Sequence, residues 1–175
     1  NSMRKPLTDR IAHQTDLTLY NIQVALSTCR FEEELNEVPV WRILYSALYE
    51  FDCRFPEPGF LCREPEFHTA GMEDLNLPYS GKPLTKDQLV EYYLDVKARI
   101  FLYLDEMDDD LLLQKPKNCP YTRLDLILDQ LRRFTYQIGR VNAFTELLLR
   151  KRPVFVGIEE DYPKDHQYFE EPHRN

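Results

Sequence analysis

The chain is poor in glycine, with five in 175 residues, although it has twelve prolines. So few glycines argue against a β fold with many tight turns, and the wealth of leucine and tyrosine favours helices. Hydrophobic residues make up 43% and charged residues 30% of the chain, which is the composition of a globular protein rather than a disordered one. A chain of this length fits one domain with a sizeable core.

Positive charge is also scarce, since the formal net charge is -8. Nucleic-acid binding needs clustered lysine and arginine, and so does adhesion to an anionic membrane surface. No apolar run approaches the roughly 20 residues of a membrane-spanning helix. We therefore expect neither nucleic acid nor a membrane among the partners, and we attribute the negative charge mainly to solubility.

The cysteines show no C-x-x-C pair. Cys29, Cys53, Cys62 and Cys119 lie far apart in the sequence, and a disulfide framework is unusual in a chain with a good core. The first residues, 1–5, lack the pattern of a signal peptide. We therefore expect reduced thiols and a cytoplasmic protein.

Four segments carry the periodicity of amphipathic helices. We expect the first from about Thr8 to Phe31, and the second after Pro39 to about Phe55. Long helices of this kind in one domain predict an all-α four-helix bundle.

The third and fourth helices have the clearest starts. Thr85 is followed three residues later by Gln88, a capping box, and we expect this helix to run to about residue 107. Thr122 and Asp125 repeat the arrangement, and the last helix should end near Arg150 because Pro153 blocks continuation.

The segments between and after these helices are less regular. The long connection between helices two and three, roughly residues 56–83, carries apolar anchors and is expected to pack. The run 108–110 of three aspartates is interpreted as a solvated turn. We divide the chain into a bundle over 1–152 and a polar, aromatic extension over 153–175, packed on the bundle or on a partner chain. The apolar anchors of the connection are Phe60, Leu61, Phe67, Met72 and Leu75, and the expected anchors of the extension are Phe155, Tyr162, Tyr168 and Phe169.

Histidines at metal-binding spacing are missing. Two histidines four apart on a helix would share a face, as bundle metal sites require, but the four present are scattered: His13, His68, His166 and His173. We interpret His13 as a helix-surface residue, His68 as an ordinary loop residue and the other two as solvated. There is also no G-x-S-x-G sequence, no P-loop and no glycine-rich dinucleotide motif.

Two stretches nevertheless resemble a known family. Residues 39–52, PVWRILYSALYEFD, are similar to the second-helix motif of the DinB/YfiT-like putative metalloenzymes, and residues 131–142, LRRFTYQIGRVN, to their last-helix motif. The start of the third helix, 84–93, is similar as well. The order and spacing of the three segments extend the resemblance over roughly residues 8–149.

The resemblance implies a four-helix bundle with a metal held by three histidines. In this chain the three ligand positions fall on Ser46, Arg133 and Gln137. Serine and glutamine are weak ligands for zinc or nickel, and arginine is none. We therefore expect no metal and no other cofactor, with the three residues converging on one polar pocket between helices two and four.

Arg133 in such a pocket needs an acidic partner, because a charge that is removed from water and left unpaired is very costly. Glu50 and Asp129 each lie one turn from a ligand position and are the candidates, and Tyr136 with Gln137 can extend the network. The site is then either a purely structural polar core or an anion pocket in which Arg133 holds a carboxylate or phosphate.

Three functions follow from these alternatives. The first is a metal-free protein that either binds a small anionic ligand or has a structural role. In that case we do not expect the family's metal-dependent enzyme activity. The second is the family's metal-dependent chemistry, a thiol-dependent transferase or isomerase or a putative hydrolase, with non-standard ligands. The third is a new metal site built from acidic residues and the tail histidines. The resemblance and the aromatic extension also predict a homodimer.

Overall fold

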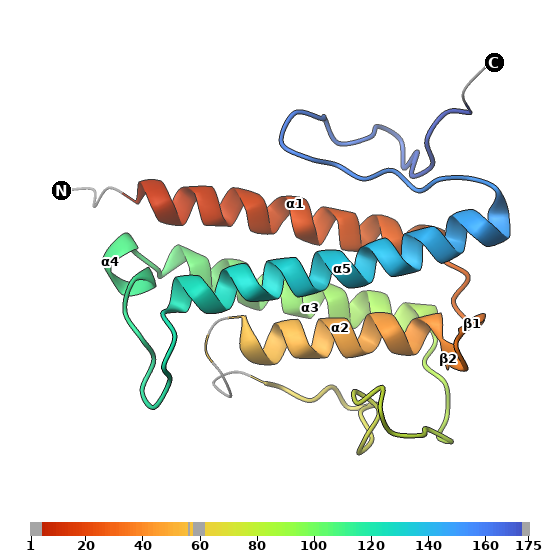
Figure 1. Ribbon diagram of the computed structural model, residues 1–175, viewed down its shortest axis with the longest axis horizontal. Coiled ribbons are helices and arrows are strands. Elements are labelled where there is room, and N and C mark those ends of the chain that lie inside the picture. Colours follow the sequence, from red (N-terminus) through yellow and green to blue (C-terminus); the bar gives the residue numbers. More distant parts are fainter. Residues whose placement is uncertain (1–4, 56, 58–61, 173–175) are drawn as a thin grey trace.

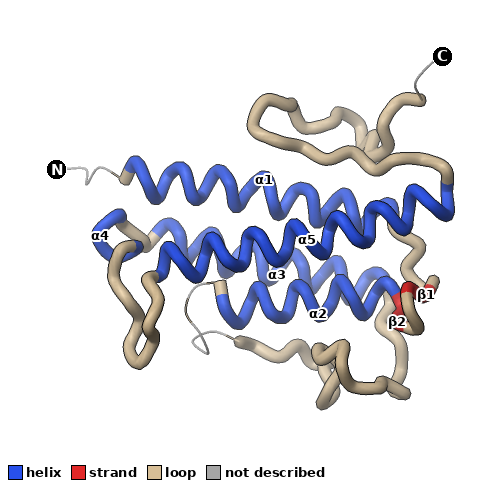
Figure 2. The backbone as a smooth tube through the Cα atoms, viewed as in Figure 1, coloured by secondary structure: helices blue, strands red, loops and turns tan. Residues whose placement is uncertain are grey.

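The computed structural model describes residues 5–55, 57 and 62–172 (Figure 1). The described chain is mostly helical, which confirms the all-α expectation at that level. The one sheet among these residues is a short antiparallel hairpin (Figure 2). The elements in order are α1 (Pro6–Thr28), β1 (Glu34–Leu35), β2 (Val38–Pro39), α2 (Val40–Arg54), α3 (Lys86–Asp105), α4 (Asp109–Leu112) and α5 (Arg123–Leu149).

The long helices begin where local chemistry predicts. Thr85 and Thr122 each cap a helix, and in both capping boxes the side chain three residues later bonds back to the cap amide. α1 begins at Pro6, whose missing N–H would have no partner in the first turn anyway. α2 follows Pro39 directly.

The four long helices surround one apolar core. α1 and α2 make their main contacts with α3 and α5. α2 and α3 run in one direction, and α1 and α5 in the other (Figure 1). The core is filled by fully buried side chains from all four, among them Leu19 and Ile22 of α1, Leu48 of α2, Val96 of α3 and Val141 of α5.

The connection between α2 and α3 runs back alongside α2, so the two helices can be parallel (Figure 1). Met72 is its buried anchor, and Phe67 and Leu75 pack partly buried against the core. Arg42, only 4% exposed, donates to the carbonyls of 71, 72 and 74. Two other expected anchors, Phe60 and Leu61, lie outside the described residues.

The aspartate run is not a solvated turn, contrary to the sequence-based interpretation. Asp108 caps the short helix α4 by accepting from the Leu111 amide. Asp109 accepts hydrogen bonds from the backbone amides of Leu7 and Thr8, at 3.1 and 2.8 Å, and from the Thr8 hydroxyl. A carboxylate is favourable there because the first amides of a helix lack partners within the helix.

The expectation of four reduced thiols is also wrong. Cys53, near the end of α2, is disulfide-bonded to Cys62 in the connection, while Cys29 and Cys119 are free. The fold brings the first pair together although nothing in their spacing indicates it. Among the described residues, no helix has the length and apolarity to cross a membrane.

The C-terminal extension packs on α1 of its own chain. Val156, 3% exposed, exchanges two hydrogen bonds with the buried Asn21 side chain, at 2.8 and 2.9 Å. Tyr162 stacks on Tyr20 with ring centroids 4.2 Å apart. Phe155, expected as an anchor, is 52% exposed. Tyr168 and Phe169 are half-buried, and Phe169 pairs with Pro153 in a β-bridge.

Candidate functional site

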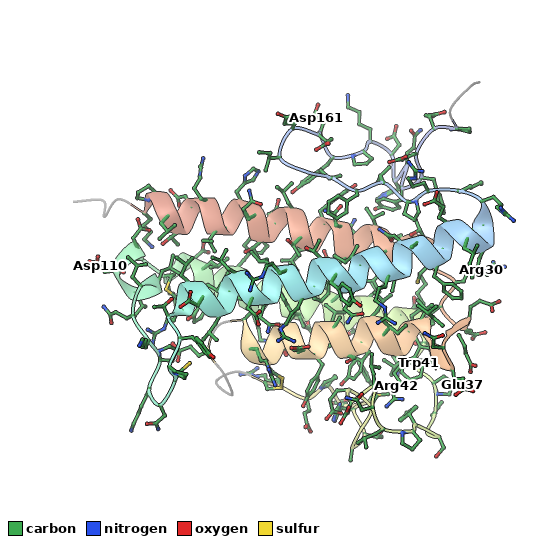
Figure 3. All side chains as sticks on the ribbon, in the orientation of Figure 1. Arg30, Glu37, Trp41, Arg42, Asp110 and Asp161 are labelled. Atoms are coloured by element: carbon green, nitrogen blue, oxygen red, sulfur yellow. A yellow bond between two sulfur atoms is a disulfide. The ribbon has the colours of Figure 1, made fainter. Side chains whose placement is uncertain are left out.

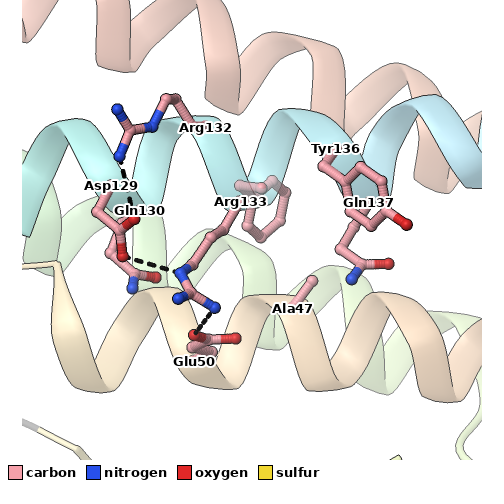
Figure 4. A pocket seen from close by; sticks show the side chains of 9 residues that line it. Ala47, Glu50, Asp129, Gln130, Arg132, Arg133, Tyr136 and Gln137 are labelled. Atoms are coloured by element: carbon pink, nitrogen blue, oxygen red, sulfur yellow. Dashed lines mark hydrogen bonds and ion pairs between the residues drawn. The ribbon is translucent and has the colours of Figure 1, made fainter.

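A polar groove of about 390 Å³ lies between α2 and α5 (Figure 4). We call it the α2–α5 groove. Its apolar floor includes Ala47 and Phe134, and its polar lining contains both signs of charge. The lining residues are Ala47, Glu50, Asp129, Gln130, Arg132, Arg133, Phe134, Tyr136 and Gln137.

Arg133 is held between two carboxylates in this groove. Its Nε donates to Asp129 Oδ2 at 2.8 Å, and its Nη1 lies 3.8 Å from Glu50 Oε1 (Figure 4). The hydrogen bond from Arg133 is the main reason why the pKa of Asp129 is lowered, and the same bond raises the pKa of Arg133. The Arg133 side chain is 59% exposed, so it is not a buried core residue.

The far end of the groove combines an amide with an aromatic ring. Gln137 Oε1 accepts from Arg140 Nη1 at 3.0 Å, and the Arg140 guanidinium lies 5.9 Å from the Tyr136 ring centroid. Tyr136 is 64% exposed. Tyr136 therefore adds an exposed aromatic ring to the lining of the groove, with the Arg140 guanidinium beside it.

Ser46 does not join Arg133 and Gln137. Its Oγ donates to the carbonyl oxygen of Glu73 in the connection, at 2.6 Å. One residue along an α-helix turns the side chain by about 100°, so Ala47 and Glu50 face α5 while Ser46 faces the connection. The structure thus brings together two of the three expected positions, with Glu50, Asp129 and Tyr136 around them.

This set of residues does not fit a divalent metal. The Arg133 guanidinium carries a fixed positive charge and no lone pair, and Ser46 is engaged elsewhere. Within residues 5–55, 57 and 62–172, no group of three or more histidine, cysteine, aspartate or glutamate side chains is placed to hold a metal ion. Of the tail histidines, His166 is exposed beside Tyr168, and His173 lies outside the described residues.

Sequence reasoning missed one polar cluster, centred on His68. Its side chain is 6% exposed and stacks on Tyr49, with ring centroids 5.0 Å apart. Nδ1 lies 2.5 Å from the Tyr45 hydroxyl, and Nε2 lies 3.5 and 3.6 Å from carboxylate oxygens of Glu73 and Glu64. Burial raises the pKa of Tyr45, and burial with the bond to Glu64 raises that of Tyr49 to about 12.

The His68 cluster fastens the connection to α2 rather than opening a site. Tyr45 is fully buried, so its hydroxyl is closed to a ligand from solvent. The signal that could have revealed it is the pair Tyr45 and Tyr49, four apart on one helix face, opposite a loop with apolar anchors.

In comparisons with known proteins, no family model, no curated protein and no solved structure matches this chain.

Proposed function

We propose that this chain is a DinB/YfiT-like four-helix bundle whose α2–α5 groove binds a small anionic ligand without a metal. The order and spacing of the second-helix and last-helix motifs support the family, and the mutual contacts of the four long helices are compatible with such a bundle. The two motifs supply the two walls of the groove.

The observation that carries the proposal is the exposure of the Arg133 side chain and the incomplete pairing of its guanidinium. It lines the groove with 59% of its side chain exposed. Nη2 has no hydrogen-bond partner within the described part of the chain, while Nη1 is only loosely paired with Glu50. Nη2 is thus open to a carboxylate or phosphate, and a ligand that binds the guanidinium in a bidentate manner would take the place of Glu50 at Nη1.

A structural role explains the groove less well. Exposed ion pairs contribute about 0–1 kcal/mol to stability, so the Arg133 pairs hold the helices together only weakly. The pair with Asp129 instead fixes the guanidinium in place, and a fixed orientation lowers the entropic cost of binding.

Calorimetric titration with inorganic phosphate, citrate and benzoate tests the proposal. We expect at least one of these probes to bind, and Arg133→Ala to abolish binding while the helical circular dichroism stays unchanged. Arg10→Ala, which removes an exposed arginine on α1, is the matched control and should bind like the wild type. Wild-type affinity in Arg133→Ala would refute the proposed role.

Metal analysis of the purified protein separates this proposal from metal-dependent chemistry. A stoichiometric transition metal bound through Ser46, Arg133 and Gln137 would contradict the proposal directly. Metal that is lost after Glu50 and Asp129 are replaced by their amides would instead favour a site with new ligands.

The homodimer stays a prediction. The extension packs on its own chain, so one of the two reasons for expecting a dimer no longer applies. Light scattering at high micromolar concentration should give twice the chain mass of 21.0 kDa. A mass near that of the single chain would contradict the prediction.

A further inference from the structure

A second and larger groove, of about 770 Å³, lies at the hairpin end of the molecule. We call it the hairpin groove. Its walls come from the β1–β2 hairpin, the start of α2 and the last part of the connection, and they include Val38, Trp41, Leu77 and Tyr79. Figure 3 shows Glu37, Trp41 and Arg42 at this end.

The walls combine polar groups with a few apolar side chains, and packing contacts hold the aromatic ones in place. Trp41 and Tyr79 pack edge to face with ring centroids 5.6 Å apart. The Arg42 guanidinium lies 5.4 Å from the Tyr79 centroid, while three loop carbonyls accept its hydrogen bonds. Leu77 is 49% exposed, so apolar surface remains open to a partner.

Three glutamates give the groove a negative rim. Glu32, Glu34 and Glu37 all line it and are all exposed. In the part of the chain that the structure describes, none of their carboxylates makes a hydrogen bond or an ion pair. The one arginine in the wall, Arg42, directs its guanidinium at the loop carbonyls.

Glu37 also sits in a conformation that disfavours its own side chain. It is the second residue of the two-residue hairpin turn, with φ 68°, after Asn36 with φ 50°. Turns of this kind need positive φ at both positions and strongly prefer Asn-Gly. Asparagine suits the first position, but a glutamate at the second is strained where glycine would not be.

We propose that the hairpin groove binds an extended peptide segment of another protein, in which basic side chains alternate with apolar ones. Side chains of an extended chain point alternately to opposite sides. One set can then pack on Leu77 and Tyr79 while the other reaches the glutamates on the rim. Charge complementarity identifies the partner as basic, and three carboxylates spread over the hairpin suit a peptide better than a single small cation.

Fluorescence anisotropy with a labelled peptide of alternating leucine and lysine tests the proposal. We expect saturable binding that weakens as salt is added, and no binding of the matched peptide in which glutamate replaces lysine. The triple change of Glu32, Glu34 and Glu37 to glutamine should weaken binding about tenfold, at about 0.5 kcal/mol for each exposed ion pair.

Two variants of Glu37 separate binding from folding. Glu37→Gly should weaken binding about two-fold to five-fold and raise Tm by about 2–4 °C, because it removes a charge and relieves the turn. Glu37→Gln should weaken binding equally with no gain in Tm. Glu106→Gln, at the far end of α3, is the control and should change neither.

Equal binding of the basic and acidic peptides, or wild-type affinity in the triple variant, would overturn the proposal. So would n-butylamine competing at the same concentration as the peptide, since the occupant would then be a small cation.

Discussion

At the scale of single residues, Asp52 is a buried carboxylate paired with the partly exposed Arg99. Asp52 is 2% exposed and accepts from Arg99 Nε and Nη2 at 3.0 and 2.8 Å. The Tyr92 hydroxyl adds a third contact at 3.4 Å. Burial raises the pKa of Asp52 in spite of the opposing effects of Arg99 and Tyr92. Arg99 thus counteracts part of the effect that burial has on this carboxylate.

Replacing Arg99 by methionine should cost about 3 kcal/mol of unfolding free energy at neutral pH, because it strands a buried carboxylate. Without Arg99 the pKa of Asp52 rises further above its unfolded value near 4. The folded protein then binds the proton before the unfolded chain does, so stability is regained as the pH falls from neutral toward about 4.

Urea titrations of the Arg99 variant at neutral pH and near pH 5 measure this recovery. Arg10→Met, on the exposed face of α1, provides the control and should show little loss at either pH. A loss that is equal at both pH values would mean that Asp52 does not titrate in this range.

At the scale of elements, α1 takes its N-terminal cap from another helix. Its own N-cap residue, Lys5, makes no side-chain cap bond, and Asp109 at the start of α4 takes that role. Desolvation acts against it, but the hydrogen bonds from Thr8 and Leu7, with the charge of Lys5, lower the pKa of Asp109. The cap thereby ties two elements that are about a hundred residues apart in sequence.

Replacing Asp109 by alanine should lower Tm at neutral pH, because three donors lose their acceptor. The folded pKa is depressed, so the stabilisation by Asp109 is present above the unfolded pKa near 4 and disappears as the pH falls through the folded value. Thermal melts of wild type and variant should therefore converge below about pH 4. Asp110→Ala is the comparison, since Asp110 is exposed and, among the described residues, forms no hydrogen bond or ion pair with α1. A pH-independent difference would argue against a charged cap.

At the scale of the whole molecule, a buried amide joins the extension to α1, in addition to the aromatic contacts of Tyr162 and Tyr168. Asn21 gives both its oxygen and its nitrogen to the Val156 backbone. This explains why a polar, acidic segment after Pro153 lies on the helices. A side chain that satisfies a backbone donor and acceptor together allows that segment to be buried at this point.

Replacing Asn21 by alanine should cost about 1–3 kcal/mol, because the Val156 amide and carbonyl lose their partners in a buried position. Trypsin should then cleave sooner at Lys164 in the extension than it does in the wild type. Gln23→Ala, which removes one partly exposed bond to Tyr168, is the milder comparison. Unchanged cleavage in the Asn21 variant would show that the aromatic contacts hold the extension without the amide.

Local sequence signals predicted the helices well, because each depends on residues within one or two turns. The capping boxes at Thr85 and Thr122 and the prolines at 39 and 153 mark ends that the structure places within three residues of the expected ones. The apolar periodicity likewise predicted which four segments form the long helices. Asp129 could be named as a neighbour of Arg133 because residues four apart share a helix face, whereas Glu50, on another helix, was named only from its spacing to Ser46, a position that the family resemblance supplied.

Long-range contacts decided the rest. Ser46 turns to the connection, Asp109 caps α1, His68 is buried against α2 and Cys53 bonds to Cys62. Each depends on how helices rotate about their axes or how a loop returns to them. The sequence by itself thus determined where the helices begin and end, since those free energies are local. Only the tertiary structure decided which polar groups meet, because burial and pairing depend on atoms that are distant along the chain.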